Sequence, residues 1–288
     1  MIGAYILIIG AMKSGTSTLF AQLAQHPAIA PAKPKEPGFF AFEEVYAQGW
    51  DWYESLFKFD PTEHQYALEG STDYTKQPFT DRTLERIRDA EAQGRRFKLI
   101  YIMRNPIKRI ESHAHHVQRV RMEVGRSRSP RKTHSFDQGI SPVNLAVSDY
   151  ADQLAPYHAW WQRGDLKLLT LEELTQNPEE TMASLGTFLD LPDLNFSSDV
   201  EHQNKTGTNK QIDPMVMAAR KSGPAAVLKR LIPAGMRKQL LDSLSTKVEV
   251  KGRFDLTSEE RAELLPRYRD QVQKLAETYG FEPGWVLE

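Results

Sequence analysis

The stretch Tyr5-Ile-Leu-Ile-Ile-Gly10-Ala-Met-Lys-Ser-Gly15-Thr-Ser17 decides the fold. Its first five residues are apolar and mostly β-branched, which is typical of a strand buried on both faces of a parallel sheet. The glycine-bracketed turn Gly10–Gly15 follows, and Thr16–Gln25 then has apolar residues at helical spacing. A strand, a glycine-rich turn and a helix in this order allow backbone N–H groups and the helix N-terminus to bind a phosphate.

This turn differs from the nucleotide-triphosphate loop G-x-x-x-x-G-K-[ST] in one respect. Thr16 stands after the second glycine, and the lysine lies inside the loop at Lys13. A triphosphate enzyme also needs an acid for Mg²⁺, and the apolar run Phe97–Met103 ends in Arg104 instead. The pattern favours an enzyme that binds one 5′-phosphate and the group attached to it. A P-loop kinase or nucleotide hydrolase, and a glycine-rich turn without a ligand, are the alternatives.

Further apolar runs alternate with amphipathic segments along the chain. Tyr66–Gly70, Phe97–Met103 and Leu166–Leu171 are expected to be strands, and Pro27–Pro37, with its prolines, is expected to be a loop. The predicted fold class is therefore α/β, a P-loop-type, mainly parallel sheet flanked by helices. Without a dividing linker, we expect a single domain, with a core at about 1–210 and a helical tail at 211–288.

Composition excludes several classes of function. The chain has 288 residues with a net charge of −1, so no overall field attracts nucleic acid or an anionic membrane. It has no cysteine, which excludes disulfides, thiolate metal sites and a cysteine nucleophile. The apolar N-terminus lacks a basic leading region and is too short for a membrane helix. We therefore expect a cytoplasmic protein without stable membrane insertion or a nucleic-acid partner.

Several separated motifs match those of one enzyme family. Lys13-Ser-Gly-Thr-Ser17 resembles a 5′-phosphosulfate loop, K-x-G-T-[ST], and Lys35-Glu36-Pro-Gly-Phe39-Phe40 resembles K-E-x-x-F-F. Glu69-Gly-Ser-Thr-Asp-Tyr74 resembles E-x-[ST]-P-x-Y, with Asp73 in a region where proline is common. Arg104-Asn-Pro106-Ile-Lys-Arg109-Ile-Glu-Ser112 matches R-x-P-x-x-R-x-x-S, and Asn204-Lys205-Thr206-Gly207 resembles a late nucleotide-closing loop. In this order the motifs resemble the PAPS-dependent sulfotransferases, especially the heparan-sulfate-like and bacterial branch.

The resemblance implies transfer of the sulfonate of 3′-phosphoadenosine 5′-phosphosulfate (PAPS) to an acceptor hydroxyl or amine, leaving 3′-phosphoadenosine 5′-phosphate (PAP), without a metal. Glu36 would be the general base, and Lys13 would stabilise charge on the leaving phosphate. The other residues that would bind the nucleotide are Ser14, Gly15, Thr16 and Ser17 at the 5′-phosphate, Arg104 and Ser112 at the 3′-phosphate, and Lys205 and Gly207 in the late loop. A small molecule, a glycan or a lipid remains open as acceptor, as does the oligomeric state.

Other interpretations of these residues stay open. Thr16 and Ser17 are also suited to cap a helix, and a Lys35–Glu36 pair is common on solvated surfaces. A general base at Glu36 would need a raised pKa, which its apolar neighbours Pro37, Phe39 and Phe40 would supply. Arg109 is as well suited to an ion pair as to a ligand contact.

The basic and histidine-rich segments have weaker interpretations. His113, His115 and His116 share one helix, but their spacing does not indicate a metal site. The basic stretch Arg119–Lys132 is a solvated loop or an entrance for an anionic acceptor. Its arginines also leave a non-enzymatic nucleotide- or RNA-binding module as an alternative function.

Overall fold

The computed structural model describes residues 1–123, 140–198, 209–212, 245–248 and 254–288. They group into two compact units. The first consists of Met1–Ile110, Ser141–Gln203 and Ser258–Glu288, and the second of Glu111–Ile140 and Asn204–Thr257. The predicted single domain remains a prediction.

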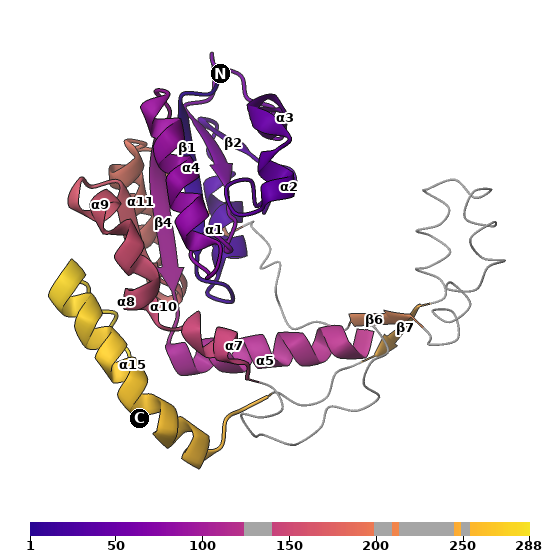
Figure 1. Cartoon of the computed structure of the whole chain (residues 1–288), viewed down its shortest axis with the longest axis vertical. Coiled ribbons are helices and arrows are strands. Elements are labelled where there is room, and N and C mark those ends of the chain that lie inside the picture. The colour runs from indigo at the N-terminus through magenta and orange to yellow at the C-terminus, as the bar shows by residue number, and fades with distance from the viewer. Residues whose placement is uncertain (124–139, 199–208, 213–244, 249–253) are drawn as a thin grey trace. The chain divides into compact units, whose positions relative to one another are not determined.

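The first unit is built on a five-stranded parallel sheet (Figure 1). Its strands are β1 (Ala4–Gly10), β2 (Ile29–Pro31), β3 (Tyr66–Glu69), β4 (Arg96–Met103) and β5 (Leu166–Thr170), in the spatial order β2-β3-β1-β4-β5. Every residue of β1 is buried, as expected for the central strand of a sheet covered on both faces. The predicted fold class is confirmed.

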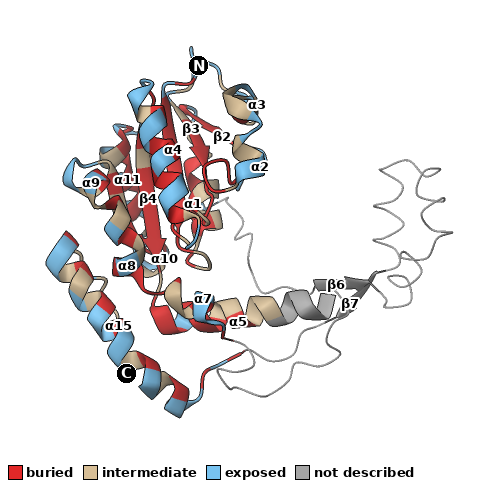
Figure 2. Cartoon of the chain, viewed as in Figure 1, coloured by how far each residue is buried: buried red, intermediate tan, exposed pale blue. Residues whose placement is uncertain are grey.

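The helices of the described residues alternate with these strands. They are α1 (Thr16–Leu23), α2 (Glu43–Tyr46), α3 (Gly49–Ser55), α4 (Thr80–Ala92), α5 (Pro106–Glu123), α7 (Pro142–Ala146), α8 (Tyr150–Leu154), η1 (Ala155–Tyr157), α9 (His158–Gln162), α10 (Leu171–Gln176), α11 (Pro178–Leu189) and α15 (Ser258–Tyr279). Figure 2 shows their outer faces exposed and the strands between them buried. The 3.6-residue periodicity of Ser258–Gly280 predicts a helix there, and α15 confirms it.

The two faces of the sheet have different cores, because alternate side chains of β1 point in opposite directions. Tyr5 and Leu7 pack with an aromatic cluster that includes Phe39, Phe40 and Tyr53. Ile6 and Ile8, on the other face, pack with aliphatic side chains of α1 and α11. Each fully buried side chain of this size contributes about 1.5–3 kcal/mol of hydrophobic free energy. Both cores therefore hold β1, and the loop that follows it, in place.

Two of three further local predictions were wrong. Pro27–Pro37 contains the edge strand β2, which tolerates Pro31 because an edge strand leaves one row of backbone groups unpaired. The sequence also predicts helical structure over Ser148–Arg163, which is confirmed by the contiguous turns α8, η1 and α9, with Pro156 inside η1. Asn177 is suited by residue type to cap the helix that it precedes, but its side chain makes no capping hydrogen bond to α11.

In the second unit, α5 continues to Glu123, and β6 (Asn209–Ile212) pairs with β7 (Ser245–Val248) in antiparallel fashion. The strand β7 is a short element within the segment predicted to be mostly helical from Asp213 on, and much of that segment lies outside the described residues. Glu111 accepts a hydrogen bond from the backbone N–H of Leu256 at 3.1 Å, which links α5 to the segment before α15 within this unit. Residues 124–132 of the basic stretch Arg119–Lys132 lie outside the described residues.

Candidate active site

The phosphate loop leaves the carboxyl end of β1 next to β4. Gly10 lies opposite Tyr101, and the N–H of Ala11 donates to the carbonyl of Ile102 at 2.7 Å. Lys13 and Gly15 both have positive φ angles, 70° and 91°, so the loop turns back sharply before α1 begins. This places the first N–H groups of α1, which have no partner within the helix, at the carboxyl edge of the sheet.

The loop has the features of an anion site. The N-cap of α1 is Gly15, and no side chain caps this helix. The hydroxyl of Ser14 is fully buried and lies beside the phenol of Tyr150. These donors fit a phosphate group. The alternative that Thr16 or Ser17 caps the helix is wrong, because both are already inside α1.

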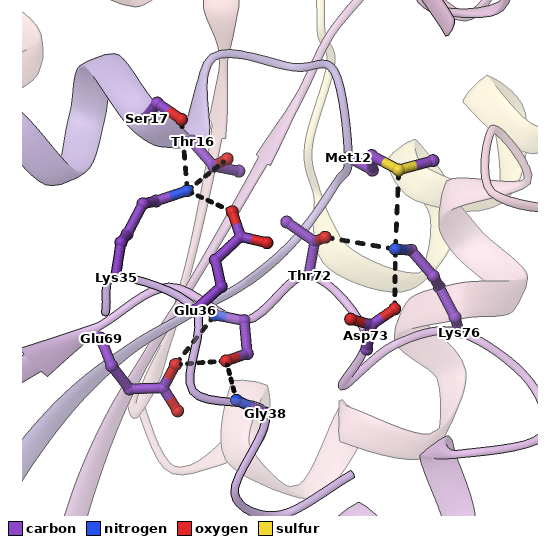
Figure 3. A network of polar contacts seen from close by, with 11 residues as sticks. Met12, Thr16, Ser17, Lys35, Glu36, Gly38, Glu69, Thr72, Asp73 and Lys76 are labelled. Atoms are coloured by element: carbon purple, nitrogen blue, oxygen red, sulfur yellow. Dashed lines mark hydrogen bonds and ion pairs between the residues drawn. The ribbon is translucent and has the colours of Figure 1, made fainter. Parts of the chain in front are cut away.

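Lys35 connects the Lys35–Phe40 motif to the phosphate loop and the start of α1 (Figure 3). Its ammonium donates to the carboxylate of Glu36 at 2.7 Å, to the hydroxyl of Thr16 at 3.1 Å and to that of Ser17 at 3.4 Å. Glu36 and the phosphate loop are therefore neighbours. The sequence displays Lys35 as part of the K-E-x-x-F-F motif but does not assign it a function. Its position next to Glu36 was the signal that could have marked it as a site residue.

The surroundings of Glu36 differ from the prediction. Its side chain is 44% exposed, while the neighbouring Phe39 and Phe40 are fully buried in the aromatic core. A dry pocket around the carboxylate of Glu36, formed by these neighbours, is therefore contradicted. The backbone turns at Gly38, with φ of 68°, so the aromatic side chains enter the core while Glu36 faces the phosphate loop.

Arg104 follows the end of β4, the neighbour of β1 in the sheet. The phenol of Tyr150 donates to the Arg104 carbonyl at 2.7 Å. Burial raises the pKa of Tyr150 to about 12, while Arg109 and the Ser14 hydroxyl beside it lower this pKa. Tyr150 thus lies between the phosphate loop and the Arg104 turn. Lys13 and Arg104 extend from the same edge of two adjacent parallel strands.

The turn after Arg104 is held by two further segments. Glu172, in α10, accepts from the N–H of Asn105 at 3.2 Å and from the indole N–H of Trp285 at 3.1 Å. The Asn105 amide donates to the carbonyl of Val286 at 3.5 Å. The segment after α15 therefore supports the turn that carries Arg104.

Arg109, for which the sequence left an ion pair and a ligand contact as equal alternatives, is bound by an amide in the structure. Its guanidinium is fully buried and donates to the carbonyl of Asn144 at 2.9 Å and to the side-chain oxygen of the same residue. Burial lowers the pKa of Arg109. Among the described residues it pairs with an amide, so it anchors α5 to α7.

A third lysine, missed in the sequence, lies beside the phosphate loop. Lys76 donates to Asp73 at 2.9 Å and to Thr72 at 3.2 Å, and its ammonium lies 3.6 Å from the sulfur of Met12 (Figure 3). These partners come from β1 and β3 segments far apart in sequence. Local motif reasoning could not have found this contact.

The remaining predicted residues are not brought together. Ser112 lies on α5 in the second unit, whereas Arg104 belongs to the first, so their common 3′-phosphate site stays a prediction. Lys205 and Gly207 lie outside the described residues. His113, His115 and His116 lie on α5, and the part of the chain that the structure describes contains no cluster of three residues suited to a metal ion.

No helix in the described ranges has the length and apolar content needed to span a bilayer.

Comparison with known proteins identifies the family. The model of the sulfotransferase domain matches residues 4–218. Bifunctional heparan sulfate N-deacetylase/N-sulfotransferase 1 of Caenorhabditis briggsae is 25% identical over 218 residues, 70% of this chain and 24% of that protein. Heparan sulfate glucosamine 3-O-sulfotransferase 6 of Homo sapiens is 28% identical over 190 residues, 64% of this chain and 52% of that protein.

The fold has a counterpart among solved structures. A crystal structure of a sulfotransferase from Alicyclobacillus acidocaldarius aligns with a TM-score of 0.63 and 20% identity, covering 98% of both chains. The chain spans about a quarter to a half of the length of the two curated relatives. With three quarters of its residues matched by the family model, and with the phosphate loop in place, the chain belongs to the sulfotransferase domain family.

Proposed function

We propose that this protein transfers the sulfonate of PAPS to an acceptor hydroxyl and releases PAP. The observation that carries the proposal is the arrangement of Lys13 and Arg104 at one edge of β1 and β4, with Tyr150 between the phosphate loop and the Arg104 turn. Opposite ends of one adenosine bisphosphate would then meet these two cations. Membership of the sulfotransferase domain family supports the same chemistry.

In the proposed reaction, PAPS supplies a sulfonate whose leaving group is the 5′-phosphate of PAP. The acceptor oxygen forms the new O–S bond, and the bond from sulfur to the bridging oxygen breaks, with its electron pair going to the phosphate. The acceptor proton passes to the carboxylate of Glu36. The ammonium of Lys13 and the N–H groups at the start of α1 stabilise the negative charge that develops on the phosphate.

Lys35 has two functions in this proposal. In the structure it holds Glu36 against the hydroxyls of Thr16 and Ser17, which keeps the base next to the phosphate loop. Its ammonium would also lie beside the phosphate group of the bound donor, since it contacts the first residues of α1. Positioning of this kind is the main requirement of in-line group transfer.

The proposed acceptor is a glycan hydroxyl, and an amine is the second possibility. The support is that the names of two relatives describe N-sulfonation and 3-O-sulfonation of heparan sulfate. A cytoplasmic location is likewise proposed from the sequence alone. Incubation with labelled PAPS and separate glycan, lipid and phenol acceptors would identify the acceptor, and cell fractionation would test the location.

Calorimetry without metal tests the donor site. The protein is expected to bind PAP more tightly than adenosine 5′-monophosphate, by tenfold or more, because a charge-assisted contact to the 3′-phosphate contributes about 1.5–3 kcal/mol. Arg104→Ala should abolish most of this difference, whereas Lys13→Ala should weaken both ligands alike. Arg96→Ala, at the exposed start of the same strand, is the matched control.

Two outcomes would contradict the proposal. Unchanged discrimination between the two nucleotides in Arg104→Ala would remove Arg104 from the 3′-phosphate site. Binding of ATP with Mg²⁺, together with no binding of PAP, would favour a kinase instead.

A further inference from the structure

A buried carboxylate lies behind the segment that carries Glu36. Glu69 is the last residue of β3 and is fully buried. One of its oxygens accepts from the N–H and the hydroxyl of Ser71, at 2.9 and 2.7 Å. The other accepts from the phenols of Tyr74 and Tyr53, the latter at 3.4 Å. All four donors converge on one carboxylate, and the sulfonate transfer proposed above assigns it no function.

The same donors hold the backbone of the Lys35–Phe40 segment. The hydroxyl of Ser71 accepts from the N–H of Gly38 at 2.9 Å. The phenol of Tyr74 accepts from the N–H of Phe40 at 3.4 Å. A third bond, from the N–H of Gly70 to the Lys35 carbonyl at 2.9 Å, completes the attachment to the end of β3.

The direction of these hydrogen bonds depends on Glu69. Each hydroxyl has a single proton to donate. When Ser71 and Tyr74 donate theirs to the carboxylate, their lone pairs are directed to the N–H groups of the Lys35–Phe40 segment. An ionised carboxylate can only accept, so it fixes this direction for both hydroxyls at once.

We propose that Glu69 is a positioning residue for sulfonate transfer, which acts through Ser71 and Tyr74 to hold the Lys35–Glu36 segment against the phosphate loop. The inference rests on the proposed function, because Glu36 is the base whose position it controls. Glu69 itself is fully buried, and its hydrogen-bond donors are Ser71, Tyr74 and Tyr53.

Protonation of Glu69 would disturb this arrangement. Burial raises the pKa of Glu69 to about 7, although its hydrogen bonds from Tyr74, Ser71 and Tyr53 lower it. The titratable groups that face it are Tyr53 from α3 and Tyr74 from the segment after β3, and burial raises the pKa of both phenols. The nearest cation on the facing segment is that of Lys35, beside Gly70. A proton on Glu69 makes one oxygen a donor, so one hydroxyl must turn its O–H away.

Steady-state kinetics of Glu69→Gln test the proposal. The variant keeps the size of the side chain but replaces one acceptor oxygen by an N–H₂ group. We expect kcat to fall about 10–100-fold, with the affinity for PAP within twofold of wild type, because the donor loop is not touched. We also expect the fall in wild-type kcat below about pH 7 to be shallower in the variant.

A matched control is available in the same aromatic core. Glu54 accepts a hydrogen bond from the phenol of Tyr5 at 3.1 Å and pairs with Arg95, but no described contact joins it to Lys35–Phe40. Glu54→Gln is therefore expected to change stability without changing kcat or its pH profile. Ser71→Ala removes the hydroxyl that links Glu69 to Gly38 and should lower kcat by a similar factor to Glu69→Gln. The double variant should lose little more than either single variant.

Amide hydrogen exchange separates this inference from the proposed function. Faster exchange at Gly38 and Phe40 in Glu69→Gln, but not in Glu54→Gln, supports the positioning role even if wild type transfers no sulfonate. Wild-type kcat and wild-type exchange at these amides in Glu69→Gln and Ser71→Ala would overturn it. An equal loss of kcat in Glu54→Gln would also overturn it, since the effect would then be one of general stability. If Glu69→Gln does not fold, Ser71→Ala alone decides between these outcomes.

Discussion

Glu36 combines an exposed side chain with a fixed position. Its carboxylate is held by Lys35, whose ammonium also contacts the first two residues of α1. A general base on the surface of the apo protein is compatible with the chemistry, because the donor and the acceptor would cover it when they bind. The substrates, and not the apolar neighbours Phe39 and Phe40, would then shield the carboxylate of Glu36 from water.

Glu36→Gln should abolish most turnover and spare donor binding. Removal of a general base lowers the rate about 10²–10⁴-fold. The affinity for PAP should change less than threefold, since the loop residues that bind the phosphate remain. Labelled-donor assays and calorimetry measure the two quantities, with the exposed Glu44→Gln as control. Full turnover in Glu36→Gln would assign the base to another residue.

Glu69 should make the free energy of unfolding depend on pH. Its pKa rises from an ordinary 4.5 to about 7 on folding, so the folded protein binds this proton more tightly than the unfolded chain. The stabilisation from the protonated form is complete below about pH 4.5, declines as pH rises to about 7 and is then absent, a change of about 3 kcal/mol.

Denaturant unfolding between pH 5 and 8 measures this dependence. We expect wild type to lose stability relative to Glu69→Gln as pH rises through that range, because the amide does not titrate. A difference between the two proteins that is independent of pH would show that Glu69 titrates at its ordinary pKa. Ionised Glu69 thus contributes less to the free energy of unfolding than protonated Glu69 does. In our proposal, the ionised form is nevertheless the one that holds the Lys35–Glu36 segment in place.

At the scale of elements, the end of β1 leaves no room for a side chain. A Cβ atom on Gly10 would lie 2.3 Å from the ring of Tyr101, which is fully buried in β4. Gly10→Ala should therefore destabilise the protein by about 1–3 kcal/mol, the usual cost of overpacking a core. Gly3→Ala, with no atom within 4 Å of the added Cβ, is the control. Equal unfolding midpoints for the two variants would contradict this expectation.

The elements that sequence predicted best are those whose signal is local. β1 and β4 are continuous apolar runs, and the helix α15 has a regular period, so each could be located without its neighbours. The edge strand β2 was missed, because three residues between prolines become a strand only through pairing with β3. The division between α8 and α9 likewise depends on how these turns pack.

In the candidate site, too, the sequence predicts the residues that have a local signal and misses the contacts that depend on the fold. Lys13, Glu36 and Arg104 stand at ends of strands or in short motifs that the sequence displays directly. The contacts of Lys76 with Met12, and of Tyr150 with the Arg104 turn, join segments that only the fold brings together. The exposure of Glu36 also could not be predicted, since it follows from the turn at Gly38.

At the scale of the whole chain, the helix α15 packs against α8 within the first unit. Arg267 forms a two-pronged ion pair with Asp149, in which Nε donates to one carboxylate oxygen at 2.7 Å and a terminal guanidinium nitrogen donates to the other. Asp149 is only 6% exposed, and the phenol of Tyr268 donates to the Leu145 carbonyl at 3.2 Å beside it. The last part of the chain is thereby attached next to the residues that support Arg104.

Arg267→Ala should lower the free energy of unfolding by about 1–2 kcal/mol, because it leaves the buried carboxylate of Asp149 without its cation. The partial exposure of Arg267 limits this loss. Asp149→Asn combined with Arg267→Ala should recover part of this stability. Thermal unfolding of the single and double variants measures the effect, and Lys274→Ala, an exposed pair on the same helix, is the control. Identical unfolding temperatures for Arg267→Ala and Lys274→Ala would contradict the assignment.

The indole of Trp285 offers an optical view of the proposed donor site. It shares the carboxylate of Glu172 with the turn after Arg104, and its ring lies 5.7 Å from that of Tyr150. The chain has five tryptophans, and the others lie on α3 and α9. A protein in which those four are replaced by phenylalanine would therefore emit from a single fluorophore whose spectrum follows the state of the Arg104 turn, so that nucleotide occupancy could be read in a cuvette without a labelled ligand.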